Sequence, residues 1–96
     1  MKMYVLVRND LTTSQQAVQC GHALAEYILK YPDAKDWNNH TLIYLGVSYK
    51  DLQELCGRYK DKLKNLAAFK EPDINNELTA FAFLEPTPEV KRIKLL

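Results

Sequence analysis

The stretch Val5–Ala25, VLVRNDLTTSQQAVQCGHALA, decides the fold because it joins a strand directly to a helix. The apolar run Met3–Val7 is typical of a strand covered on both faces. One of the two threonines Thr12 and Thr13 is predicted to cap a helix, since a glutamine follows each of them three residues later in capping-box spacing. The first backbone N–H groups of a helix lack internal acceptors, so a strand that delivers such an end to a sheet edge favours an anion site there.

The rest of the chain continues this alternation of strands and helices. The first helix is predicted to end near Lys30, before Pro32. A second strand is predicted over 41–46, followed by a helix capped by Ser48, and two further strands are predicted over 67–70 and 78–84. The second helix carries an apolar stripe: Leu52, Leu55, Cys56, Tyr59, Leu63 and Leu66. Thr87-Pro88-Glu89 predicts a short terminal turn. The order β-α-β-α-β-β indicates an α/β fold with a small mixed sheet, in which the last two strands could form a hairpin.

Composition narrows the class of protein. The chain has 96 residues, enough for one domain with a single modest core, and 47% of them are apolar. The net charge of +1 does not by itself indicate a nucleic-acid-binding protein. With two cysteines in helical patterns and no leader segment, we expect a reduced, cytoplasmic protein. No apolar run approaches the roughly 20 residues that span a bilayer. Scattered His and Cys and isolated glycines predict no metal site, no phosphate-binding glycine loop and no cofactor.

The first helix has two faces of different chemistry. At about 100° per residue, one side is predicted to form the core stripe: Ala17, Cys20, Gly21, Leu24 and Ile28. The opposite side carries Gln15, Gln19, His22 and Glu26. This polar stripe is either a solvated helix face or one wall of a cleft, in which the imidazole would be a candidate proton carrier. On the core side, Cys20 is predicted to be buried and unreactive.

Basic side chains and a polar loop are the other two features that could carry function. The basic residues gather at the end of the second helix and at the C-terminus: Arg58, Lys60, Lys62, Lys64, Lys91, Arg92 and Lys94. They either complement a helix dipole or form a patch for a sugar-phosphate backbone. The loop 71–77 lies between two apolar strands and is either an ordinary turn or a functional loop. Its carboxylates Glu71 and Asp73 flank Pro72, and Thr79 opens the following strand.

Several of these residues resemble the pattern of type II peptidyl-tRNA hydrolases. That family pattern runs strand, Arg-x-Asp-Leu and then a helix reading Ala-x-Gln-Cys-x-His-Ala. The matching residues are Arg8, Asp10, Leu11, Ala17, Gln19, Cys20, His22 and Ala23. Thr79 and the strand after it match the family's last threonine, and the final residues 93–96 are similar to its terminal Leu-Lys-Leu-Leu. Two features depart from the pattern: Gln15 stands where the family has its catalytic lysine, and the family's Asp-Ala-Gly is absent.

The resemblance implies a single domain over 1–96, with a mixed four-stranded sheet covered by helices on both faces, and a homodimer. It also implies hydrolysis of the ester between a peptide and the 3′ end of tRNA. The implied catalytic residues are Thr79, Glu71, Asp73 and Gln15, and the implied substrate-binding residues are Asp10, Gln19, His22 and Asn76. The implied contacts to tRNA phosphates are Arg58, Lys62, Lys91 and Arg92. Because Gln15 cannot supply the positive charge of the family lysine, two alternatives stay open. One is a non-catalytic module that binds tRNA ends or a protein, and the other is an enzyme for a different ester or amide.

Overall fold

The fold is seen in a computed structural model that describes residues 1–33 and 36–84. In chain order, its elements are β1 (Met3–Arg8), α1 (Thr13–Lys30), β2 (Leu42–Val47), α2 (Tyr49–Lys62), β3 (Leu66–Glu71), a 3-10 turn η1 (Pro72–Ile74) and β4 (Glu77–Phe83). This order is the one predicted from the sequence, and the predicted strand boundaries differ by one residue at most. The predicted stripe of the second helix was too long, because α2 ends at Lys62 and Leu66 belongs to β3. The terminal turn predicted at Thr87 lies outside the described residues.

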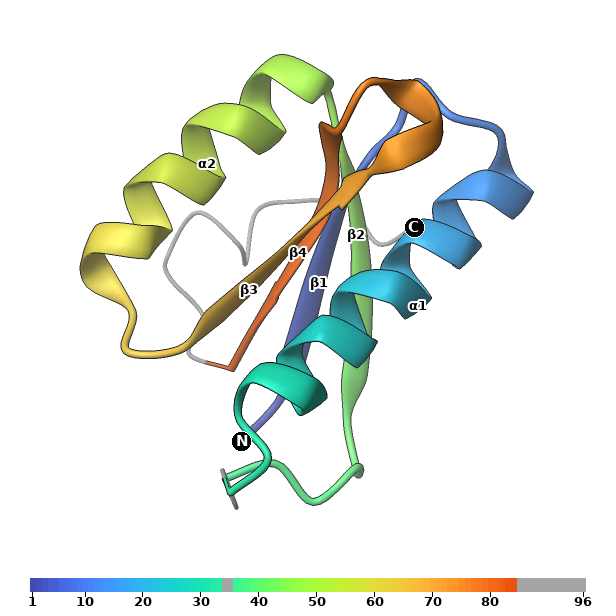
Figure 1. The fold of residues 1–96 in the computed structure, drawn as a ribbon. Coiled ribbons are helices and arrows are strands. Elements are labelled where there is room, and N and C mark those ends of the chain that lie inside the picture. The colour runs from blue at the N-terminus through green and yellow to red at the C-terminus, as the bar shows by residue number, and fades with distance from the viewer. Residues whose placement is uncertain (34–35, 85–96) are drawn as a thin grey trace.

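The four strands form one mixed sheet in the order β2-β1-β4-β3. The first two strands are parallel, as a helical crossover requires, whereas β4 runs antiparallel to both of its neighbours. The last two strands therefore form a hairpin. Figure 1 shows α1 on one side of the sheet and α2 on the other, with the hairpin tip beside the start of α1. The α/β fold with helices on both faces is confirmed.

Strand β1 is buried on both faces and divides the core in two. All six of its residues are buried. Val5 and Val7 face the core under α1, while Tyr4 and Leu6 face the core under α2. Cys20 has no exposed surface in the α1 core, and burial raises the pKa of its thiol to about 12. The expectation of a buried, unreactive Cys20 thus agrees with its environment.

The face of α1 that packs on the sheet was predicted wrongly. Its buried residues are Gln16, Gln19, Cys20, Ala23 and Tyr27. Ala17, Gly21 and Ile28, assigned to the core stripe, are exposed instead, and Leu24 is half-buried. The helix is rotated so that Ala23 and Tyr27 pack against the sheet. This rotation takes Gln19 inward, where hydrogen bonds to its amide group reduce the penalty for burying it.

A bulge in β4 interrupts the hairpin ladder. Phe69 pairs with Ala80, but the next residue of β3, Lys70, pairs with Leu78. Thr79 is therefore an extra residue without an opposite partner on β3. Ala80 belongs to the α1 core and Leu78 packs on the α2 core, while the Thr79 side chain reaches α1. Two consecutive side chains, 79 and 80, thus face α1, as a β-bulge produces.

Candidate functional site

A pocket lies where the start of α1 meets the tip of the β3–β4 hairpin. Its cavity has a volume of about 300 Å³. It is lined by Leu11, Ser14, Gln15, Val18, Gln19, Glu71, Asp73, Ile74 and Thr79. The fold thus brings together in one cavity all four predicted catalytic residues and Gln19, although they come from segments more than 50 positions apart.

A row of hydrogen bonds connects three of these side chains. The Thr79 hydroxyl donates to the side-chain carbonyl oxygen of Gln19 across 2.6 Å. The amide nitrogen of Gln19 in turn donates to Oε1 of Glu71 across 3.0 Å. Because a carboxylate accepts hydrogen bonds but does not donate them, the Gln19 side chain must turn its N–H₂ group towards Glu71. Its carbonyl oxygen then faces Thr79 and accepts the hydrogen bond that the hydroxyl donates. Thr79 has no exposed surface and Gln19 is only 6% exposed, so the half-buried Glu71 is the member open to the pocket.

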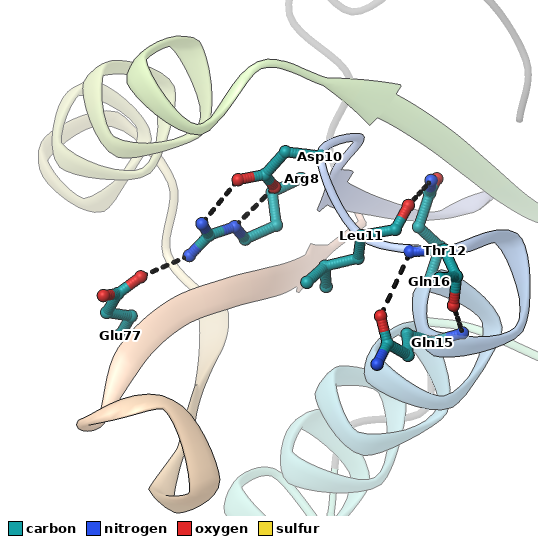
Figure 2. A network of polar contacts seen from close by, with 7 residues as sticks. All are labelled: Arg8, Asp10, Leu11, Thr12, Gln15, Gln16 and Glu77. Carbon is teal, nitrogen blue, oxygen red and sulfur yellow. Dashed lines mark hydrogen bonds and ion pairs between the residues drawn. The ribbon is translucent and has the colours of Figure 1, made fainter.

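The N-terminus of α1 forms another part of the wall. Thr12 caps the helix and accepts a hydrogen bond from the backbone N–H of Gln15. The side-chain carbonyl oxygen of Gln15 accepts from the Thr12 backbone N–H at 3.1 Å, which completes the predicted capping box (Figure 2). Gln15 thus lines the pocket, but its carbonyl oxygen is engaged in the cap and only its amide N–H₂ group is available to a ligand. The lining residue Ser14 lies in the first turn, where backbone N–H groups lack intrahelical acceptors.

Asp10 lies outside this pocket, in an ion-pair cluster around Arg8. Both oxygens of Asp10 accept from the Arg8 guanidinium, at 2.6 and 2.7 Å, and Glu77 accepts from its third nitrogen at 2.7 Å (Figure 2). The guanidinium carbon also lies 3.8 Å from the centre of the Tyr49 ring. The hydrogen bond from Arg8 holds the pKa of Asp10 below its usual value. These contacts tie the end of β1 to the start of β4 and of α2, so Asp10 has a structural function here.

The remaining predicted residues lie apart from the pocket. The His22 ring is stacked on Phe69, with ring centres 4.4 Å apart, and it does not line the cavity. Asn76 lines a different groove, on the α2 side of the sheet. Arg58 and Lys62 are exposed on the last turns of α2, whereas Lys91 and Arg92 lie outside the described residues.

The pocket is acidic. Its two charged lining residues are Glu71 and Asp73, and none of the lining residues is Lys, Arg or His. A phosphate would therefore be repelled, and the lysine position of the family is filled by a neutral amide. Within residues 1–33 and 36–84, no group of three His, Cys, Asp or Glu side chains could hold a metal ion. Neither helix of these residues is both long and apolar enough to cross a membrane.

Some lining residues were not anticipated from the sequence. Leu11, Val18 and Ile74 supply an apolar wall, and Ser14 supplies the helix end. Leu11 matches the family pattern but was not predicted to line a site. Val18 is 55% exposed on α1, and the sequence pattern did not indicate that it lines a pocket.

Comparisons with known proteins do not assign the chain to a family. No protein-family model matches the chain, and no curated protein matches it either. The geometry of the pocket is therefore the main basis for a functional assignment.

Proposed function

We propose that the protein is an ester hydrolase of the peptidyl-tRNA hydrolase kind, which cleaves the bond between a peptide and the 3′ ribose of tRNA. The observation that carries this proposal is the hydrogen-bonded row Thr79–Gln19–Glu71, which ends in a pocket that also holds Asp73 and Gln15. The resemblance of Arg8–Leu11 and of Gln19–Ala23 to that family supports it.

In this proposal Glu71 is the catalytic base. Its carboxylate accepts a proton from a water molecule, whose oxygen attacks the ester carbonyl carbon. The bond to the ribose oxygen then breaks, and that oxygen takes the proton back from Glu71. Gln19 and Thr79 are positioning residues, since their own side chains are covered and act by holding Oε1 of Glu71. Asp73 would help to orient the water.

The developing negative charge on the carbonyl oxygen needs hydrogen-bond donors. The pocket offers the Gln15 amide N–H₂ group and the backbone N–H groups at the start of α1, but no lysine. Neutral donors stabilise an oxyanion less than a cation does, so we expect slow hydrolysis in the wild-type protein. Gln15→Lys should raise the rate, although the positive helix end would depress the pKa of the new amine.

The test is single-turnover release of tRNA from a model peptidyl-tRNA. Glu71→Gln should abolish release, Thr79→Val should reduce it strongly, and Gln15→Lys should increase it. Glu54→Gln, the same change on the exposed surface of α2, is the matched control and should leave the rate unchanged. A rate of tRNA release that is unchanged by the substitutions at positions 15, 71 and 79 would contradict the proposal. Release from other esters or amides, but not from peptidyl-tRNA, would favour a different substrate.

A second candidate function is a non-catalytic module that binds a tRNA end or a protein. Two observations favour it: the pocket has no cationic lining residue, and the Gln15 carbonyl oxygen is engaged in the helix cap. Binding of uncleaved peptidyl-tRNA, with no release in either the wild-type protein or Gln15→Lys, would support this alternative. Under both candidates we propose tRNA as the partner in the cytoplasm, with Arg58 and Lys62 among its phosphate contacts. Binding should then weaken steeply between about 50 and 200 mM salt.

A further inference from the structure

A second cavity lies on the opposite side of the sheet, between α2 and the β3–β4 hairpin. It is a groove of about 390 Å³. Its helix wall carries Gln53, Gly57 and Lys60, which follow one another at i, i+4 and i+7 and so share one face of α2. Its strand wall carries Lys70, and the hairpin tip adds Asn75 and Asn76.

The electrostatic character of this groove is opposite to that of the α1 pocket. Burial raises the pKa of the Cys56 thiol on the groove wall, and the positive charges of both Lys60 and Lys70 oppose that rise. Both ammonium groups therefore lie close enough to Cys56 to contribute to the electrostatic potential of the groove. Glu77, the acidic residue among the lining side chains, is bound at 2.7 Å by Arg8, which it shares with Asp10. The groove thus carries the two lysine charges against the single carboxylate of Glu77, so its lining is net positive.

The polar side chains of the groove are available for a ligand. Within the described residues, the side chains of Lys60, Lys70 and Gln53 have no hydrogen-bond or ion-pair partner, and the same holds for Asn75 and Asn76. Both asparagines have a φ of 59°, the left-handed conformation that asparagine tolerates better than most residues. Two ammonium groups and three amides converge here, which is a donor set suited to phosphoryl oxygens.

Gly57 leaves the middle of the helix wall open. A Cβ atom built at this position would meet no other atom within 4 Å, so the space above the helix backbone is free. A glycine inside a helix is less stable than alanine by about 1 kcal/mol. The open space at Gly57 leaves room for a ligand to approach the helix backbone closely.

From these observations we propose that the groove between α2 and the β3–β4 hairpin binds the phosphate of a nucleotide unit, with Lys60 and Lys70 on the phosphoryl oxygens. The asparagine and glutamine amides contact the rest of the nucleotide, which lies over Gly57. The nucleotide is either free or part of a polynucleotide, since both present the same phosphate. This site is distinct from the acidic α1 pocket and stands whether or not that pocket is catalytic.

The test is titration of the ¹⁵N-labelled protein with AMP, with adenosine and with a short single-stranded RNA, followed by amide chemical shifts. AMP or the RNA should shift the signals of Gln53, Gly57, Asn75 and Asn76, and adenosine should not. Binding by AMP alone identifies a free nucleotide as sufficient, and binding by the RNA alone identifies a polynucleotide; either result supports the site. Shifts confined to the α1 pocket, or equal shifts with adenosine, would overturn it.

Two variants locate the site without relying on any one lysine. Gly57→Glu places a side chain with a negative charge in the groove, where nothing obstructs it, and should abolish binding. Gly21→Glu makes the same change on α1, where a Cβ also has free space, and should leave binding intact. Lys60→Gln combined with Lys70→Gln should weaken binding by at least roughly tenfold. Binding that survives Gly57→Glu unchanged would contradict the proposal even if the lysine variants unfold.

Discussion

Thr79 holds Gln19 by a hydrogen bond of 2.6 Å inside the contact between β4 and α1, although the two residues are 60 positions apart in the chain. The bond is buried, and its loss leaves a polar atom without a partner. It connects the stability of the domain to the arrangement of the candidate site.

The first prediction concerns this bond. Thr79→Val keeps the shape of the side chain but removes the donor, so the Gln19 carbonyl oxygen is left unsatisfied. We expect a loss of about 1–3 kcal/mol in the free energy of unfolding, measured by urea titration. Adding Gln19→Leu to Thr79→Val should cost less than the sum of the two single changes, because the pair is then removed together. Strictly additive effects would mean that the bond does not form in solution.

The second prediction concerns pH. The hydrogen bond from Arg8 lowers the pKa of Asp10 from its ordinary value of 3.8. Asp10 therefore stabilises the fold above pH 3.8, and this contribution disappears as the pH falls through the lower pKa of the folded state. Asp10→Asn should cost less than about 1 kcal/mol at pH 7, because the Asp10 side chain is half-exposed. In urea titrations, this difference from wild type should shrink towards pH 2. The exposed Asp61→Asn, on α2, should show no comparable trend.

The third prediction concerns the thiols. Cys20 and Cys56 are 0% and 4% exposed, and burial raises the pKa of both. Neither should react rapidly with a thiol reagent at neutral pH in the folded protein, whereas both should react at once in concentrated urea. The rate of reaction in each condition is followed by the absorbance of the chromophore that the thiol reagent releases. One fast equivalent in the native protein would show that a cysteine is open to solvent.

The fourth prediction concerns Gly21 in the middle of α1. The position is exposed, and an added Cβ would meet nothing within 4 Å. Gly21→Ala should therefore stabilise the protein by up to about 1 kcal/mol through helix propensity. For a domain of this size, that gain corresponds to a rise in Tm of roughly 4–8 °C. A fall in Tm would indicate that another molecule packs closely on this part of the helix.

The fifth prediction concerns assembly. Ile28 and Leu29 at the end of α1 are 50% and 74% exposed, which is unusual for large apolar side chains in an isolated domain. We expect a two-fold dimer, the commonest closed symmetry, in which a second copy covers these residues. Light scattering at tens of micromolar should give about twice the chain mass of 11.1 kDa, and Leu29→Glu should shift it towards the single chain. A wild-type protein that stays at 11.1 kDa would exclude the dimer.

The sequence predicted the order of elements well because strand and helix periodicities are local. Ser48 was predicted as a cap, and the first cap was narrowed to Thr12 or Thr13, since a capping hydrogen bond joins residues three positions apart. The run Met3–Val7 was correctly assigned as a buried strand for a similar reason, since it is apolar at every position. Such features need no knowledge of the tertiary structure.

The rotation of α1 and the grouping of the site could not be obtained in the same way. Gln19 is polar, and only its bonds to Thr79 and Glu71, distant in sequence, make its burial favourable. The pocket residues were named from a family pattern, while the contacts that join them depend on the register of β4. The groove at Lys60 and Lys70 was not predicted because a helix residue and a strand residue meet there across the packing of two elements.

Because of the bulge at Thr79, the strand pairing of the hairpin does not depend on a residue of the candidate site. In a regular strand, successive side chains alternate between the two faces of the sheet. The extra residue Thr79 interrupts this alternation once, between Leu78 and Ala80. Every other pair of the hairpin keeps its partner whether or not position 79 exists. The pairing with β3 therefore places no demand on the side chain at position 79, and a substitution there disturbs the contact with Gln19 rather than the strand ladder.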